Sequence, residues 1–143
     1  MTALSEVIAA CDATVAAHGV PNPGAGRFDP AEHGAVRAFV LEAVYEGYLL
    51  HYDTPRAFQG LDEDLRLLAG DALYALGLAR LAEDDDLEAV GELADLISLC
   101  AWAHAEGHPE RAEELWEASA RILSPAGGAG AAASVAGNLA PQR

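Results

Sequence analysis

The chain contains no lysine. All eight basic residues are arginines, against 23 aspartates and glutamates, and the formal net charge is −15. Without lysine, a Schiff base on a lysine amine and the lysine-containing phosphate loop of many nucleotide-binding proteins are both excluded. The charge also disfavours nucleic acid and anionic membrane surfaces as partners, because both would repel so acidic a chain.

Cysteines and long apolar runs are also scarce. The two cysteines, Cys11 and Cys100, lie far apart in apolar surroundings, which favours buried thiols in a reducing compartment over a disulfide. The first residues lack the basic stretch of a secretory signal. The longest strongly apolar run, residues 96–105, is too short to span a bilayer. These features predict a cytoplasmic protein with no membrane insertion.

The apolar residues follow a helical period. Aromatic residues make up only 6% of the chain, whereas 52% of it is hydrophobic, and much of that is alanine, the best helix former. No stretch alternates as a half-buried strand would. We expect an all-α fold, a compact bundle of about five helices over residues 4–17, 29–51, 62–81, 86–106 and 109–123. Residues 1–124 should form a single helical domain, and the Ala/Gly-rich residues 125–143 a disordered tail.

Aspartate, glycine and proline residues place the helix ends. Asp29 is the expected N-cap of the second helix, and Pro30 its first residue. Asp85 is the expected N-cap of the fourth helix. Gly107 should end that helix and Pro109 should begin the fifth.

Three of the glycines inside the expected helices, Gly47, Gly70 and Gly77, lie among apolar residues. A glycine in mid-helix costs about 1 kcal/mol relative to alanine, so its presence needs a reason. Close approach of a neighbouring helix is such a reason. We therefore expect tight helix contacts at Gly47, Gly70 and Gly77.

Two groups of residues are candidate metal ligands. Cys100, His104 and His108 recur every four residues, and cysteine with histidine suits zinc. However, Gly107 and Pro109 place His108 in a turn, and the alternative is a core thiol, a partly buried histidine at His104 and an N-cap of the fifth helix at His108.

Glu42 and Glu46 form the second group. They lie one helical turn apart and could hold Mg²⁺ together with Asp71 and Glu92. The alternatives are a solvated helix edge or pairing with an arginine such as Arg37 or Arg66. The helices carry none of the paired Glu-x-x-His motifs of di-iron bundles, and no serine lies in a Gly-x-Ser-x-Gly elbow.

The stretch GYLLHYDTPRA, residues 47–57, resembles one helix of the trans-isoprenyl diphosphate synthases. That helix carries the family's first aspartate-rich motif, in which Leu-Leu-His is followed by Asp-Asp-x-x-Asp. The following residues, 67–98, resemble the next two helices of the family, with a Leu-Ala-Gly-Asp opening, an aliphatic helix, a short turn and an acidic-apolar helix.

The motif itself is degenerate. Aligned on Leu-Leu-His, its three aspartates fall on Tyr52, Asp53 and Arg56, so one carboxylate of three remains. An arginine at such a position would repel the metal that the family uses to bind its allylic diphosphate. The resemblance therefore implies an all-α scaffold without that chemistry, similar to the non-catalytic small subunits of two-component prenyl synthases.

We therefore expect a non-catalytic accessory or regulatory subunit that binds a protein partner, such as a prenyl-synthase-like enzyme, or forms a homo-oligomer. The alternatives are a small isoprenoid- or lipid-binding protein and a minimal Mg²⁺-dependent prenyl diphosphate enzyme. No catalytic residue and no metal site is predicted, and Mg²⁺ is the one cofactor left open. The predicted ligand or partner surface comprises Glu42, Glu46, Tyr48, His51, Asp53 and Asp71.

Overall fold

The computed structural model describes residues 2–124, which form seven helices and no strand. The predicted all-α class is confirmed, and five of the helices are eight residues or longer. The predicted tail, residues 125–143, lies outside the described residues. In the part of the chain that is described, no helix is both long and apolar enough to cross a bilayer.

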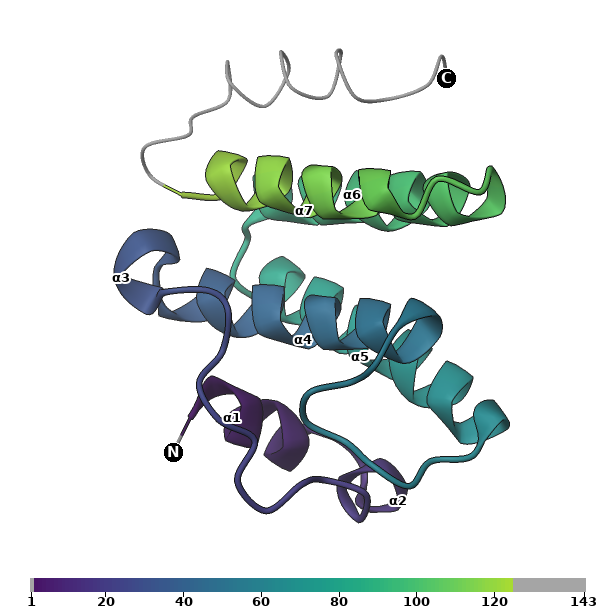
Figure 1. Cartoon of the computed structure of the whole chain (residues 1–143). Coiled ribbons are helices and arrows are strands. Elements are labelled where there is room, and N and C mark those ends of the chain that lie inside the picture. Colours follow the sequence, from purple (N-terminus) through teal and green to yellow (C-terminus); the bar gives the residue numbers. More distant parts are fainter. Residues whose placement is uncertain (1, 125–143) are drawn as a thin grey trace. The chain divides into compact units, whose positions relative to one another are not determined.

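The described chain divides into two compact units, one ending at Asp84 and the other beginning at Asp85. The single domain expected from the chain length stays a prediction. The first unit contains α1 (Ala3–Ala10), α2 (Ala13–Ala16), α3 (Pro30–His33), α4 (Ala35–Tyr52) and α5 (Glu63–Glu83) (Figure 1). The second contains α6 (Leu87–Ala105) and α7 (Glu110–Ile122).

The helix predicted over residues 4–17 is interrupted, so its continuity was wrong. Cys11 and Asp12 both have extended backbones, and α1 ends there. Asp12 begins a new helix because its side chain accepts a hydrogen bond from the Val15 N–H at 3.1 Å. An aspartate thus acts here as an N-cap within an otherwise continuous apolar pattern.

The helix predicted over residues 29–51 is also divided, at Gly34. Asp29 is the N-cap as expected, and its carboxylate accepts from the Ala31 N–H at 2.8 Å. Only one helical turn follows, since Gly34 has a φ of +85°, a conformation that glycine adopts without strain. The main helix of the unit, α4, begins only after this turn.

Helix α4 is the centre of the first unit and packs against α1, α3 and α5. The predicted glycine contacts are confirmed where α4 meets α5. A Cβ on Gly47 would lie 2.9 Å from the Gly70 carbonyl oxygen, and a Cβ on Gly77 would lie 2.5 Å from Val44 Cγ2. Between these two helices there is room for a hydrogen atom and not for a methyl group.

The second unit is a helical hairpin. The N-cap of α6 is Asp86, whose side chain accepts a hydrogen bond from the Ala89 N–H at 3.3 Å. The prediction of Asp85 as this N-cap was therefore wrong by one residue. Gly107 ends α6 as expected, with a φ of +77°, and the His108 N–H donates to the Ala103 carbonyl at 2.8 Å.

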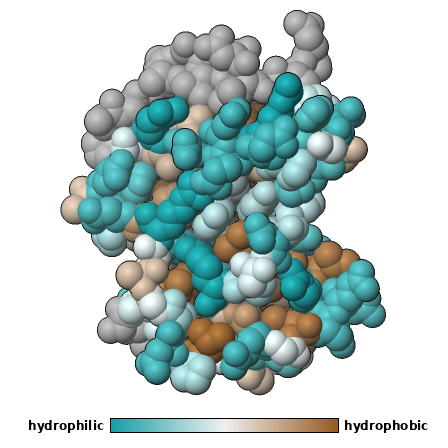
Figure 2. All heavy atoms as spheres, in the orientation of Figure 1, coloured by the Kyte–Doolittle hydropathy of each residue, from teal (hydrophilic) through white to brown (hydrophobic). Residues whose placement is uncertain are grey.

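Helix α7 is amphipathic, and its visible side is hydrophilic (Figure 2). Trp116 and Ile122 on its other side are buried. Between α6 and α7, the Ser119 hydroxyl donates to Glu92 Oε2 at 2.7 Å. Pro109 is the N-cap of α7, one position before the place predicted for it.

Candidate functional site

Two carboxylates are buried in the middle of α4. Glu42 and Glu46 lie one turn apart, and both are 0% exposed. An unpaired charge removed from water costs several kcal/mol, so both carboxylates require donors close by. The prediction that they belong to a solvated helix edge is therefore wrong.

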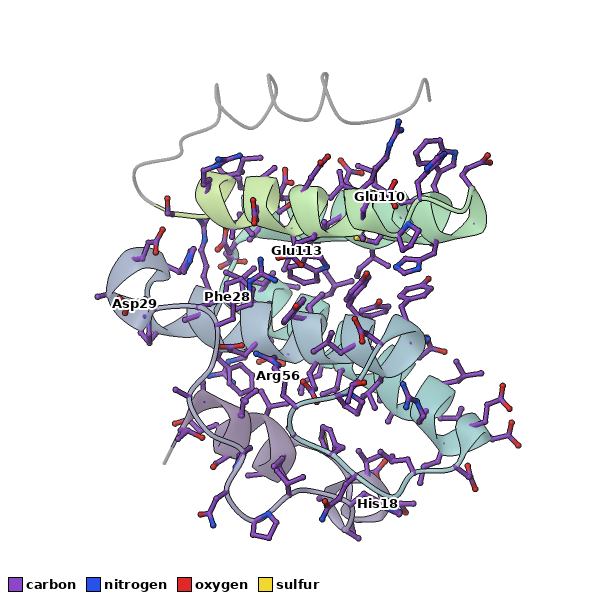
Figure 3. All side chains as sticks on the ribbon, in the orientation of Figure 1. His18, Phe28, Asp29, Arg56, Glu110 and Glu113 are labelled. Carbon is purple, nitrogen blue, oxygen red and sulfur yellow. The ribbon has the colours of Figure 1, made fainter. Side chains whose placement is uncertain are left out.

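Arg56, in the loop between α4 and α5, supplies the positive charge (Figure 3). Its Nη1 donates to Glu42 Oε1 at 2.7 Å, and its Nε donates to Glu46 Oε1 at 3.0 Å. Its Nη2 donates to the backbone carbonyl of Glu42 at 3.2 Å. One guanidinium, itself 23% exposed, thus bridges both acids. Pairing with an arginine was predicted correctly, but the partner is Arg56, whereas Arg66 donates to backbone carbonyls at the end of α4.

Backbone N–H groups satisfy the remaining carboxylate oxygens. Glu42 Oε2 accepts from the Phe28 N–H at 3.0 Å, and Glu46 Oε2 accepts from the Arg56 and Ala57 N–H groups, each at 2.8 Å. All four carboxylate oxygens of the pair therefore accept at least one hydrogen bond. We call Glu42, Glu46, Arg56 and these backbone donors the buried acid network.

The loop before α3 closes tightly over this network. A Cβ on Gly26 would lie 1.6 Å from Glu42 Oε2, so only glycine fits there with the present geometry. The Tyr45 ring faces the Arg56 guanidinium at 4.8 Å, and the Arg27 guanidinium lies at the same distance from that ring. Cations over an aromatic face are favourable, which further fixes Arg56.

The other predicted site residues lie mostly on an aromatic line that crosses from α4 to α5. The Tyr48 ring stacks on Tyr45 with centroids 6.0 Å apart and lies 5.2 Å from Tyr52. The His51 ring lies 5.8 Å from Tyr52 and 5.2 Å from Tyr74. All four tyrosines of the chain are in this line.

The structure therefore separates the predicted surface into parts. Tyr48, His51 and Asp71 come together, since His51 Nε2 lies 3.0 Å from Asp71 Oδ1 and His51 and Tyr48 both contact Tyr52. Glu42 and Glu46 belong to the buried acid network. Asp53 stands at the C-terminal end of α4, where its Oδ1 accepts from the Thr54 N–H at 2.8 Å.

Glu42, Glu46 and Arg56 form an ion-paired cluster of the kind that stabilises a fold. Their oxygens are already occupied by N–H donors, and a guanidinium lies where a cation would have to bind. Among residues 2–124, no group of three or more histidine, cysteine, aspartate or glutamate side chains is placed to hold a metal ion. His108 lies in the turn after α6, as predicted, with its Nδ1 3.2 Å from Glu110 Oε1.

Sequence reasoning missed the role of Arg56, although the signal was present. Glu42 and Glu46 share the side of α4 that carries Ala43, Gly47 and Leu50, which are buried. Two acids on an apolar side require a cation, and Arg56 is the first basic residue after them. The backbone donors of the Gly26–Phe28 loop carried no comparable signal, because their sequence specifies only an irregular segment.

Both thiols lie in surroundings that favour the neutral form. Burial raises the pKa of Cys100 to about 12, and the Glu113 carboxylate adds to the effect. Burial also raises the pKa of Cys11 to about 11, with contributions from the Asp12 and Glu46 carboxylates. At neutral pH both sulfurs are protonated, and the thiolate is the nucleophile and the metal ligand.

We expect both cysteines to resist alkylation in the folded protein. At pH 8 the thiolate fraction should be lower than that of an ordinary thiol by about two orders of magnitude or more. Intact-mass spectrometry after timed iodoacetamide treatment would measure the rates, with the protein in denaturant as the control. Equal rates in the folded and denatured protein would contradict the burial of Cys100 and the partial burial of Cys11.

The comparisons with known proteins found no relative, so the interpretation of the site depends on its geometry. No family model, curated protein or solved structure matches the chain. The resemblance of about residues 42–98 to prenyl synthases therefore stays a prediction.

Proposed function

We propose that the protein is a non-catalytic helical subunit that acts by binding a protein partner. The buried acid network supports the non-catalytic part of this proposal, and the resemblance to prenyl synthases suggests the partner. In the resembled family, a carboxylate cluster holds Mg²⁺ and an allylic diphosphate. Here the corresponding helix carries two glutamates whose oxygens are occupied, and the arginine that occupies them falls on the motif's last aspartate position. By that resemblance, a prenyl-synthase-like enzyme is the candidate partner.

A Mg²⁺-dependent enzyme is less well supported by the same contacts. Mg²⁺ in phosphate-transferring sites is usually held by one or two carboxylates together with substrate phosphates. Asp53 is the one carboxylate retained from the motif, and Arg56 follows it three residues later. The guanidinium of Arg56 would oppose a second cation near the glutamates.

A carrier of isoprenoids or lipids would need an apolar cavity. One depression of the first unit, of about 410 Å³, is lined in part by Arg27, Asp29 and Glu42. Another, of about 470 Å³, is lined by His18 and Gln59 with three small residues. Both are wide open to solvent, so neither would enclose an apolar chain.

Two measurements on the full-length protein test the proposal. Affinity purification from the native host should retain one protein in stoichiometric amount. Calorimetric titration with a prenyl diphosphate in the presence of Mg²⁺ should give no heat of binding. Mg²⁺-dependent binding of the diphosphate would contradict the non-catalytic assignment. Recovery of this chain alone would contradict the proposal that it binds a protein partner.

A further inference from the structure

We infer that the junction of α4 and α5 is a docking surface for a basic protein partner with an apolar contact. Four large hydrophobic side chains are exposed in the described residues, and three of them belong to the last residue of α4 and the first two turns of α5. Tyr52 is 39% exposed, Leu67 45% and Leu68 65%. We call these three residues the leucine patch. The inference rests on the proposed function and assigns a place and a chemistry to its partner.

Polar contacts hold the first turns of α5 against the end of α4. Arg66 donates through Nε to the Leu50 carbonyl at 3.2 Å and through Nη2 to the Asp53 carbonyl. One turn later, Asp71 lies 3.0 Å from His51, whose ring contacts Tyr52. Leu67 and Leu68 precede Asp71 on α5 by four and three residues, so both side chains border Asp71, which lies against His51 and, through the His51 ring, against Tyr52.

The rim of the leucine patch is acidic. On α5, Glu63 and Asp64 lie one turn before the two leucines, and Asp71 lies one turn after them. All three acids are exposed, as is Asp53 at the end of α4.

The nearby basic side chain does not balance this charge at the patch. Arg66 is the only basic residue between positions 57 and 79. Its guanidinium is bound to the carbonyl oxygens of Leu49, Leu50 and Asp53. It is therefore directed toward the end of α4, where the last carbonyls of a helix carry partial negative charge.

An apolar centre with an acidic rim fits a partner of the opposite pattern. Apolar residues supply most of the affinity at the centre of an interface, and rim charges set specificity and the rate of association. The fitting partner is a leucine-bearing surface or helix flanked by arginine and lysine. A second copy of this chain fits poorly, because it would bring the same acids and a net charge of −15 to the contact.

Peptide binding to the full-length protein tests this directly. The probe is a synthetic amphipathic helix with leucines on one side and lysines on the other, and a second peptide carries glutamate in place of every lysine. Fluorescence anisotropy should show saturable binding of the lysine peptide and none of the glutamate peptide. The double variant Leu67→Ser/Leu68→Ser should bind the lysine peptide about tenfold more weakly or worse, as expected when central contacts are truncated.

The matched control is Leu87→Ser. Leu87 is the fourth exposed hydrophobic residue and lies in the second unit, at 71% exposure. Its replacement should change the affinity by less than about twofold, as for a surface substitution away from the interface. Circular dichroism should show that all variants keep their helix content.

Three results would overturn the inference. They are absence of saturable binding, equal binding to the Leu67→Ser/Leu68→Ser variant, and equal weakening by Leu87→Ser. The second would show attraction by net charge alone, and the third would show an apolar effect that is not specific to the leucine patch. A dimer of the wild type that the double variant abolishes would instead assign the leucine patch to a second copy. If the wild type and the double variant both retain one stoichiometric protein from the host, the proposed function stands. The assignment of the leucine patch as the docking surface is then wrong. If neither retains any protein, the proposed function itself fails.

Discussion

Replacing Arg56 with methionine is expected to lower the free energy of unfolding of the first unit by about 3–5 kcal/mol. The variant would leave Glu42 and Glu46, both 0% exposed, without their shared cation. Methionine keeps much of the length of the side chain, so the loss would come from charge and hydrogen bonds more than from volume. A domain has only about 5–15 kcal/mol of stability, so the change could unfold the unit at 37 °C. Urea denaturation followed by far-UV circular dichroism would measure it.

Two further variants separate the network from general effects of losing an arginine. Arg80→Met removes an exposed guanidinium that lies 5.3 Å from the Phe39 ring, and should cost less than about 1 kcal/mol. Adding Glu42→Gln and Glu46→Gln to Arg56→Met should recover part of the loss, because the unpaired charges are then gone. If Arg56→Met lowered the free energy of unfolding no more than Arg80→Met does, the buried acid network would not stabilise the fold.

Replacing Gly47 with alanine is expected to destabilise the first unit, although alanine is the better helix former. The added Cβ would lie 2.9 Å from the Gly70 carbonyl oxygen and 2.9 Å from the Tyr74 ring. The carbonyl is backbone and cannot turn aside, so α4 and α5 must separate. Such overpacking costs about 1–3 kcal/mol. The helix-propensity gain of about 1 kcal/mol offsets only part of that cost. Thermal unfolding monitored through the near-ultraviolet circular dichroism of the four tyrosines would detect the change.

Gly91→Ala is the matched control, with the opposite expected sign. Gly91 also lies within a helix, α6, but a Cβ there would have no neighbour within 4 Å. The substitution should therefore raise stability by about 0.5–1 kcal/mol. Trp102 and Trp116, the two tryptophans of the chain, both lie in the second unit, so their fluorescence would follow its unfolding. If Gly47→Ala also stabilised the protein, the close packing of α4 on α5 would be wrong.

The helices were predictable wherever an apolar period and a cap agree. Asp62 begins α5 as expected, and its carboxylate accepts from the Leu65 N–H at 2.8 Å. Gly107 ends α6 for a similarly local reason. The two interruptions were missed because the apolar pattern continues across them. At Asp12 and at Gly34, one residue's preference for a cap or a positive φ is stronger than that pattern.

The site was less predictable than the helices. The approach of Gly47, Gly70 and Gly77 to neighbouring side chains could be inferred, because glycine in mid-helix needs a local reason. The partner of Glu42 and Glu46 could not be chosen from helical spacing alone, because Arg56 reaches them from a loop. The Phe28 N–H, which donates to Glu42 Oε2, comes from a second loop, 14 residues before Glu42 in the sequence. No side-chain pattern marks such a backbone donor.

The buried acid network also makes two loops part of one cooperative unit. A surface loop ordinarily opens at little cost, independently of the helices that it connects. If the segment around Phe28 lifted away, Glu42 would lose a backbone donor, and if the segment around Arg56 did so, both glutamates would lose their cation. Each opening would expose or orphan a charge inside α4. Both segments should therefore remain closed until α4 itself unfolds, so the irregular parts of this unit are as long-lived as its central helix.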